Sequence, residues 1–257
     1  MPEVEFRAAL TTDELKAAAR LVYREYCRRG YVPPHDEGLR LTIFHAIPDT
    51  VMFLAVHQIL GVIGTVTLIP DSPLGLPMDD VYGPELADLR ARGHRLAEAS
   101  MFAFDRTVGQ RDALPMFRIN QLTLTLRLFK ALFDHLRHET RTSELLACAH
   151  PRHRRLYEFL QMESLAGQRP YASVGGHPAL AWRLNLARSH ARSSRVPVLR
   201  FFYGSQHVMP PKLRPRTLSE HDLQELFVQS SSVFATADLA TMAYLQLRYP
   251  TYTFALA

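Results

Sequence analysis

Near the N-terminus the hydrophobic pattern changes from strand-like to helical. Residues 4–10 predict a short strand. Thr11 then begins a helix, because Glu14 stands at the third helical position and completes a capping-box pattern. Apolar residues follow at helical spacing and the pattern stops near Gly30: Leu15, Ala19, Val22 and Tyr26. Residues 31–40, which include two adjacent prolines and Gly38, predict a loop.

The next part of the chain predicts strands around a long excursion. Residues 51–56 and 62–69 are β-rich and separated by a short turn containing Gly61, which is hairpin spacing. Residues 70–93 carry four prolines and predict a long loop with a short helix at 85–92. Residues 94–105 predict a buried central strand.

The remaining elements alternate between helix and strand. A strong helix is expected from Pro115, a strand at 143–149, a helix at 151–162 and closing strands at 165–174 and 179–186. Residues 189–195 are polar and basic and predict a linker. Beyond it, Ser219 is expected to cap a helix with Leu218 and Leu223 as a hydrophobic staple, and a second helix is expected at 237–247. This order predicts a mixed α/β layer fold with a helical C-terminal extension.

Composition narrows the class of protein. The chain has 257 residues, of which 47% are hydrophobic, and this excludes a disordered chain. Cys27 and Cys148 belong to no CxxC pair, so neither a disulfide scaffold nor a thiolate zinc site is expected. No segment is typical of a signal peptide or a membrane span, so we expect a cytoplasmic protein.

The basic residues are unusual because 27 of the 30 are arginine. Arginine binds carboxylates and phosphates through a planar fork, which favours an acidic or phosphate-bearing partner. The alternative is ordinary solvated surface charge. No basic run with interleaved aromatic residues indicates a nucleic-acid partner.

Glu98 is the first candidate for chemistry. It lies in a segment otherwise suited to burial, and strand alternation places it on the same face as Ser100. A carboxylate in apolar surroundings has a raised pKa and can accept a proton near neutral pH. The alternative is a carboxylate paired with an arginine at the rim of the sheet.

Further candidates follow the predicted strand at 143–149. Tyr157, one turn into the next helix, could donate a proton to a leaving thiolate or could simply pack in the core. Arg152, Arg154 and Arg155 could form a patch for a phosphate or an acidic partner, or could be solvated charge.

Several catalytic classes receive no support. The pairs His135/His138 and His150/His153 have helical spacing, but neither has a third ligand at a suggestive offset, so no metal is predicted. No Gly-rich phosphate loop is present, Ser100 is not in a G-x-S-x-G turn, and Cys148 has no patterned partner.

Taken together, the element order and several short motifs resemble a known family. The order resembles the GNAT acyltransferase fold, and within it the chain is similar to the long-chain N-acyl amino acid synthases, relatives of the acyl-homoserine-lactone autoinducer synthases. The motifs are FLA at 53–55, GTVTL at 64–68, DS at 71–72, GLPMD at 75–79, LRARG at 89–93, LAEAS at 96–100, CAHP at 148–151 with His153 and Tyr157, RPY at 169–171 and GGHPA at 175–179.

The resemblance implies transfer of a fatty acyl group from the phosphopantetheine thioester of an acyl carrier protein to an amine, usually that of an amino acid. Glu98 matches the family's proposed base and Ser100 the second polar position of that strand. Phe102, Phe104, Phe129 and Tyr157 would bind the acyl substrate, and backbone amides of the strand would polarise the thioester carbonyl. No bound cofactor is expected. Membrane association through the lipid product is a further expectation.

Two motifs that are absent from the chain indicate which acyl donor and which reaction to expect. CoA-using GNAT enzymes carry a (Gln/Arg)-x-x-Gly-x-(Gly/Ala) turn after the central strand, and residues 106–111 read RTVGQR. A carrier-protein donor fits this gap better, and its acidic surface would suit an arginine patch at Arg152, Arg154 and Arg155. Met101 stands where the autoinducer synthases usually have a basic residue, which argues against lactone formation.

We therefore expect an N-acyltransferase domain at residues 1–190 and a mostly helical extension at 191–257. Two other functions stay open from the sequence. One is an inactive GNAT-like module that binds acyl carrier protein or lipid, and the other is an acyltransferase with a different acceptor.

Overall fold

The N-terminal elements fold as their capping pattern predicts. The computed structural model describes residues 4–109, 121–204 and 216–254. Strand β1 (Val4–Ala8) leads into helix α1 (Thr12–Arg28), where the Thr11 hydroxyl accepts a hydrogen bond from the Glu14 N–H at 3.2 Å. The Glu14 carboxylate in turn accepts from the Leu10 N–H at 2.8 Å. These bonds satisfy donors that a helix N-terminus otherwise leaves free.

Seven strands form one mixed sheet, as expected. Their order is β1-β2-β3-β4-β5-β7-β6, and every neighbouring pair is antiparallel except β4 and β5. The further strands are β2 (Val51–His57), β3 (Gly61–Pro70), β4 (Leu96–Phe104), β5 (Glu144–Ala149), β6 (Glu163–Tyr171) and β7 (His177–Asn185). The predicted hairpin at residues 51–69 is confirmed by the pairing of β2 with β3.

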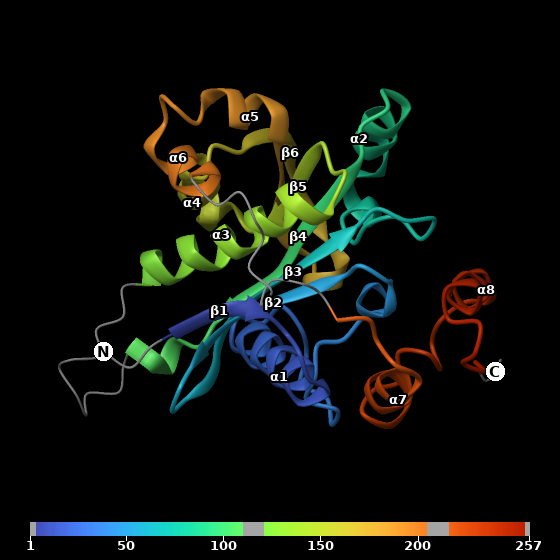
Figure 1. Cartoon of the computed structure of the whole chain (residues 1–257). Helices are drawn as coiled ribbons and strands as arrows, with labels where there is room; N and C mark the ends of the chain where they lie inside the picture. The colour runs from blue at the N-terminus through green and yellow to red at the C-terminus, as the bar shows by residue number, and fades with distance from the viewer. Residues whose placement is uncertain (1–3, 110–120, 205–215, 255–257) are drawn as a thin grey trace.

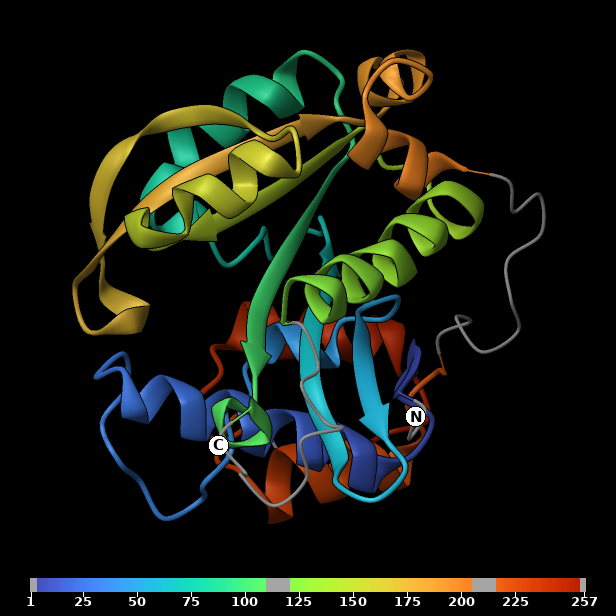
Figure 2. The same ribbon diagram turned by 90° about the vertical axis from the view of Figure 1, so that its left-hand side faces the viewer.

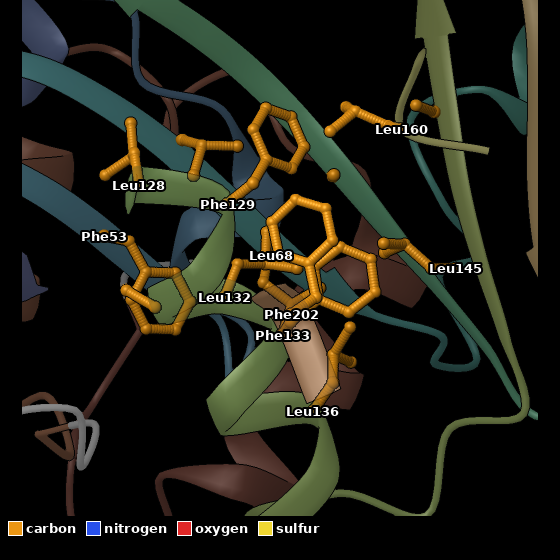
Figure 3. Close-up of a cluster of buried hydrophobic side chains, with 14 of the residues drawn as sticks. Phe53, Leu68, Leu128, Phe129, Leu132, Phe133, Leu136, Leu145, Leu160 and Phe202 are labelled. Carbon is orange, nitrogen blue, oxygen red and sulfur yellow. The ribbon is translucent and has the colours of Figure 1, made fainter. Parts of the chain in front are cut away.

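Helices cover both faces of this sheet (Figure 1). Alternate residues of β2 show the two layers, because Phe53 packs in the core under α3 (Gln121–Glu139), whereas Met52 and Leu54 pack with Ala18 of α1. The Pro115 start predicted for α3 lies outside the described residues. Figure 3 shows the α3 side of the core, in which Phe133 stacks on Phe202 with ring centroids 4.5 Å apart.

The excursion between β3 and β4 contains a longer helix than the sequence predicts. Helix α2 spans Asp79–Ala91, although it was expected only from residue 85. Pro84 lies inside it and Tyr82 has non-helical dihedral angles, so the helix is kinked. The buried Tyr82 phenol donates to the carbonyls of Gly167 and Ala179, at 3.0 and 2.8 Å, which holds the kink against β6 and β7.

The expected linker at residues 189–195 is different in the structure. Helix α5 (Leu186–Arg192) occupies most of it, and the Asn185 side chain caps this helix by accepting from the Arg188 N–H at 2.8 Å. Helix α6 (Pro197–Tyr203) then inserts Leu199 and Phe202 into the main core. Polar composition concealed these elements, because α5 is short and exposes most of its side chains. Residues of α6, beyond position 190, therefore belong to the main apolar core.

The described part of the C-terminal extension is mostly helical, as expected, and has its own apolar cluster. Helix α7 (Glu220–Gln224), one π-helical turn (Glu225–Gln229) and α8 (Leu239–Arg248) pack against α1 and the short helix η1 (Ile43–Ala46). Ser219 caps α7 by accepting from the Asp222 N–H at 3.2 Å. The buried Asp222 carboxylate also accepts hydrogen bonds from Thr12 and Arg216, which ties the extension to α1.

Candidate active site

A cavity opens where two parallel strands of the sheet separate. Strands β4 and β5 pair only from Leu96–Glu98 to Glu144–Leu146, and beyond this point β4 stays with β3 while β5 stays with β7. Figure 2 shows the green β4 ribbon diverging from β5. The cavity measures about 380 Å³ and is lined by residues 98–104 of β4 and 148–150 at the end of β5.

A β-bulge in β4 reverses its side-chain alternation at this point. Thr67 of β3 pairs with Ser100 and Thr65 pairs with Ala103, so β4 has one extra residue, and Met101 has a φ of 51°. Before the bulge, Ala97 and Ala99 face the α3 core. After it, Met101 and Ala103 face α1, where they pack with Leu21 and Val22.

The bulge therefore divides the candidate site residues between two faces. Glu98 and Ser100 share the face of α1 and α2, as predicted. Phe102 and Phe104, whose rings lie 5.3 Å apart, turn to the α3 face. The cavity consequently has a polar half on the α1 side of the sheet and an apolar half on the α3 side.

Glu98 is a buried carboxylate with raised proton affinity. It is 1% exposed, and its Oε2 accepts a hydrogen bond from the Met78 N–H at 3.0 Å. Burial raises the pKa of Glu98 to about 7, and the negative charges of Asp79 and Asp80 add to the rise, while hydrogen bonds from Met78 and Ser100 oppose it. Among the described residues no arginine forms an ion pair with Glu98, so the rim ion pair considered above is not formed.

Tyr157 and Cys148 line the wall opposite β4. Tyr157, on helix α4 (Arg154–Phe159), is buried and stacks on Trp182 with ring centroids 5.6 Å apart. Burial raises the pKa of both the Tyr157 phenol and the Cys148 thiol, and the Glu98 charge adds to both shifts. Tyr157 therefore packs in the core and also reaches the cavity, so core packing does not exclude a contact with the substrate.

The apolar half is built from β4, α3 and α4. Phe102 and Phe104 line it together with Leu122 and Leu156. Phe129 is 5.5 Å from Phe102 between ring centroids, but it is not among the residues that line the cavity. In the described part of the chain Phe129 therefore supports the wall from behind.

The polar half contains residues that the sequence did not single out. This side is lined by Tyr26 of α1, Arg29 at the C-terminal cap of α1, Arg40 of the following loop, Asp80 and Ser173. Two motifs lie close to these residues: GLPMD at 75–79, which Asp80 directly follows, and RPY at 169–171, which precedes Ser173 and brings Tyr171 to the cavity. No motif marks Arg40, which the tertiary fold brings to this site from a separate segment.

The predicted arginine patch lies beside the cavity. Arg152 follows β5 in the 3-10 helix η4 (Pro151–His153), donates a hydrogen bond to the Tyr31 phenol, and lies 5.4 Å from the centre of its ring. Arg154 and Arg155 begin α4 and are exposed. His153 and Leu156 of the same segment line the cavity, whereas the three arginines do not, and Arg152 reaches it only through Tyr31.

The pKa values of His150 and His153 are lowered, which favours their neutral forms. Burial lowers the pKa of His153 to about 4, and burial with the charge of Arg152 lowers that of His150. Within the described ranges no three His, Cys, Asp or Glu side chains are grouped to hold a metal ion. In the same ranges no helix is long and apolar enough to cross a membrane.

Comparison with known families decides the assignment. The family model of the N-acyl amino acid synthase FeeM matches residues 17–185. This chain belongs to that family. The protein is an acyltransferase with a GNAT-like fold, and all the candidate residues from Glu98 to Tyr157 lie within the matched region.

Solved structures agree with the assignment. The N-acyl amino acid synthase FeeM from uncultured soil microbes is 26% identical, with a TM-score of 0.65 over 78% of this chain and all of that one. A CoA-dependent acyl-homoserine lactone synthase, BjaI, is 17% identical with a TM-score of 0.55, over 87% of this chain and 98% of that one. The acyl-homoserine lactone synthase LasI is 17% identical with a TM-score of 0.52, over 72% and 89%. A sequence search of curated proteins finds no match.

For this synthase family member, the expected N-acyltransferase activity is thus supported by family and fold together. The two lactone synthases share its fold only, at identities below those that indicate a common reaction. The C-terminal segment at 216–254 lies outside the region that the family model matches.

Proposed function

We propose that this protein transfers a long-chain fatty acyl group from the phosphopantetheine thioester of an acyl carrier protein to the α-amine of an amino acid. The observation that carries the proposal is Glu98, a buried carboxylate with a pKa of about 7, placed where a two-sided cavity crosses the sheet. A base with this pKa is half ionised near neutral pH and is suited to deprotonating an ammonium group.

The α-ammonium group loses two protons in the proposed step, and the leaving sulfur takes up one. Glu98, directly or through a water molecule, removes the first proton, and the neutral amine attacks the thioester carbonyl carbon. As the carbon–sulfur bond breaks and the amide forms, the nitrogen loses its second proton, which protonates the leaving thiolate, while the first is released from Glu98 to solvent. Tyr157, whose phenol stays protonated because it is buried, is placed to donate a hydrogen bond to the leaving sulfur.

The bulge in β4 would stabilise the transition state. An extra residue in a bulged strand leaves backbone groups out of the ladder, and β4 has lost its β5 neighbour at the same place. Free N–H groups around Met101 could therefore donate to the oxyanion that forms on the thioester carbonyl.

The apolar half of the cavity favours a long acyl chain. Each methylene group removed from water contributes about 0.8 kcal/mol, so the walls formed by Phe102, Phe104, Leu122 and Leu156 would select for chain length.

The donor is proposed from charge. Arg154 and Arg155 are exposed at the start of α4, which also carries the cavity residues Leu156 and Tyr157, and they suit an acidic carrier protein. The Gly-rich turn of CoA enzymes is missing from the RTVGQR segment at 106–111, of which residues 106–109 form the short 3-10 helix η2 (Arg106–Gly109) and residues 110 and 111 lie outside the described ranges. A carrier-protein donor also implies a cytoplasmic enzyme whose lipid product brings it to a membrane surface.

Turnover with defined donors tests the proposal. The purified protein is incubated with the twenty standard amino acids and either dodecanoyl-acyl carrier protein or dodecanoyl-CoA, and products are measured by mass spectrometry. We expect N-dodecanoyl amino acids with the carrier-protein donor and much less with CoA. Faster transfer from CoA would refute the donor, and thioester consumption without any acylated amino acid would refute the acceptor.

A further inference from the structure

Two arginines in the polar half of the cavity have no acidic partner. Arg29 and Arg40 both line the cavity, and neither forms an ion pair with any described residue. Elsewhere arginines of similar burial are paired, as Arg90 is with Asp71 and Asp79. Guanidinium groups without carboxylates in a cavity are suited to an anionic ligand.

Arg40 is held in place with one donor unused. Its Nη2 donates to the Ser173 carbonyl at 2.9 Å, which fixes the planar group against the turn after β6. Its Nε is buried and has no hydrogen-bond partner among the described residues. A buried donor without an acceptor is unfavourable, so an anion that binds beside Arg40 would stabilise the site by accepting a hydrogen bond from Nε.

The opposite charge lies on the other side of the same serine. The Ser173 hydroxyl donates to Asp80 Oδ2 at 3.5 Å, while the Ser173 carbonyl accepts from Arg40, so the two charges are held apart and form no ion pair with each other. Asp80 is also close enough to Glu98 for its charge to raise the pKa of Glu98. A positive group at Arg40 and negative groups at Asp80 and Glu98 complement the two opposite charges of a zwitterionic ligand.

Tyr26 lines the same cavity as these groups. The positive charges of Arg29 and Arg40 lower the pKa of its phenol and the negative charge of Glu98 raises it. Burial raises its pKa to about 12, so it stays a neutral hydrogen-bond donor. Arg40, Tyr26 and Glu98 thus line one cavity, so a single ligand can contact all three.

We propose that Arg40 binds the α-carboxylate of the acceptor amino acid, while Asp80 and Glu98 face its α-ammonium group. This inference rests on the proposed function and identifies the residue that would restrict the acceptor to molecules with a free carboxylate. It also sets a direction, because the acceptor enters from the α1 side and the acyl chain lies on the α3 side of β4.

Product binding tests this inference without requiring turnover. Trp182 is the only tryptophan and stacks on Tyr157 in the cavity wall, so its fluorescence reports occupancy. The two probes are N-dodecanoylglycine and N-dodecanoylglycinamide, which differ in the carboxylate alone. We expect the wild-type protein to bind the acid at least about tenfold more tightly than the amide, since charge-assisted hydrogen bonds are lost in the amide.

Variants locate the effect. Arg40→Gln should bind the two probes about equally, and Arg40→Lys should keep part of the preference because it keeps the charge. Arg200→Gln is the matched control, because Arg200 is exposed, also donates to a backbone carbonyl, that of Ser194, and lies outside the cavity. This control should keep the full preference.

Failure of this inference is distinguishable from failure of the proposed function. Equal binding of acid and amide by the wild-type protein would overturn the carboxylate site even if acyl transfer to amino acids occurs. If Arg40→Gln instead weakened binding of the acyl carrier protein and spared the preference for the acid, Arg40 would serve the donor phosphate and the inference would be wrong. If the acid probe bound tenfold more tightly but no acyl transfer occurred, the carboxylate site would be supported and the proposed reaction would be refuted.

Discussion

At the scale of single residues, the raised pKa of Glu98 suits its proposed role as a base but has an energetic disadvantage. Its burial makes the ionised form unfavourable, and the same burial gives the carboxylate a pKa of about 7. The bond from the Met78 N–H keeps the carboxylate oriented without supplying a full counter-charge. A structural ion pair would have lowered the pKa instead and would have removed the base.

The rate of acyl transfer should follow the ionisation of Glu98. Because the base acts only when deprotonated, kcat/KM should rise with pH and level off above about 7. A pH profile with dodecanoyl-acyl carrier protein measures this. A profile that stays flat from pH 5.5 to 8 would contradict the role of Glu98.

Stability should depend on pH in the opposite direction. The native state holds a proton on Glu98 up to about pH 7, whereas the usual pKa is 4.5, so the free energy of unfolding contributed by this group falls as pH rises through that window. Glu98→Gln should remove this fall and be more stable than wild type at pH 8, by up to about 3 kcal/mol. Urea unfolding of both proteins at pH 5 and pH 8 measures this difference. The prediction would be contradicted if the stability of Glu98→Gln relative to wild type were lower at pH 8 than at pH 5.

At the scale of elements, the bulge in β4 determines how the cavity is divided. Without it, Phe102 and Phe104 would continue the face of Glu98 and Ser100, and the acyl wall and the base would lie on one side of the sheet. Met101, with its positive φ, absorbs the extra residue. The neighbouring strand adapts, since Gly64 of β3 pairs with Phe104 and leaves room for its ring.

Gly64→Ala tests this arrangement. A Cβ at residue 64 would lie 2.1 Å from Cε1 of Phe104, so the ring must move, and we expect a loss of about 1–3 kcal/mol in stability together with slower acyl transfer. Thermal unfolding and the transfer assay measure the two effects. Gly83→Ala is the matched control, because no heavy atom lies within 4 Å of the added Cβ, and it should show neither loss.

The sequence predicts these elements unequally. The caps at Thr11 and Ser219 and the hairpin of β2 and β3 were predictable because each depends on neighbouring residues. Strand alternation correctly placed Ser100 with Glu98 but could not reveal the bulge, since one extra residue leaves no pattern in the side chains. Arg40, Asp80 and Ser173 could not be predicted as a group, because their contacts join segments far apart in the chain.

At the scale of the whole molecule, two apolar clusters hold different parts of the chain. The main cluster includes α6, although composition placed the domain boundary at residue 190. The second cluster joins α7 and α8 to α1, whose residue Tyr26 lines the cavity, as does Arg29 at the C-terminal cap of this helix. The extension therefore supports α1 and, with it, the polar half of the cavity.

Adjacent phenylalanines test the boundary. Phe202 is fully buried and stacks on Phe133, so Phe202→Ala should destabilise the whole domain by about 3–5 kcal/mol in urea unfolding. Phe201 is 43% exposed, and Phe201→Ala should change stability by less than about 0.5 kcal/mol. Equal effects would mean that α6 does not belong to the main core in solution.

Carrier-protein docking should depend on salt and on the exposed arginines. Attraction between Arg154 or Arg155 and an acidic partner is screened as ionic strength rises, so kcat/KM for the carrier-protein donor should fall severalfold between low and high salt. Arg154→Glu with Arg155→Glu should lower it at low salt and remove most of the salt dependence. Binding of N-dodecanoylglycine should be unaffected by the double change, and an unchanged kcat/KM would exclude this patch from docking.

The most direct test of the central claim is the lipid content of a bacterium that overproduces the protein. Lipids from cells with the wild-type protein and with Glu98→Gln are compared by mass spectrometry at equal protein levels. We predict N-acyl amino acids with long acyl chains in the first extract and their absence from the second. Equal amounts of such lipids in both extracts, or none in either, would contradict an acyltransferase that uses Glu98 to acylate amino acids.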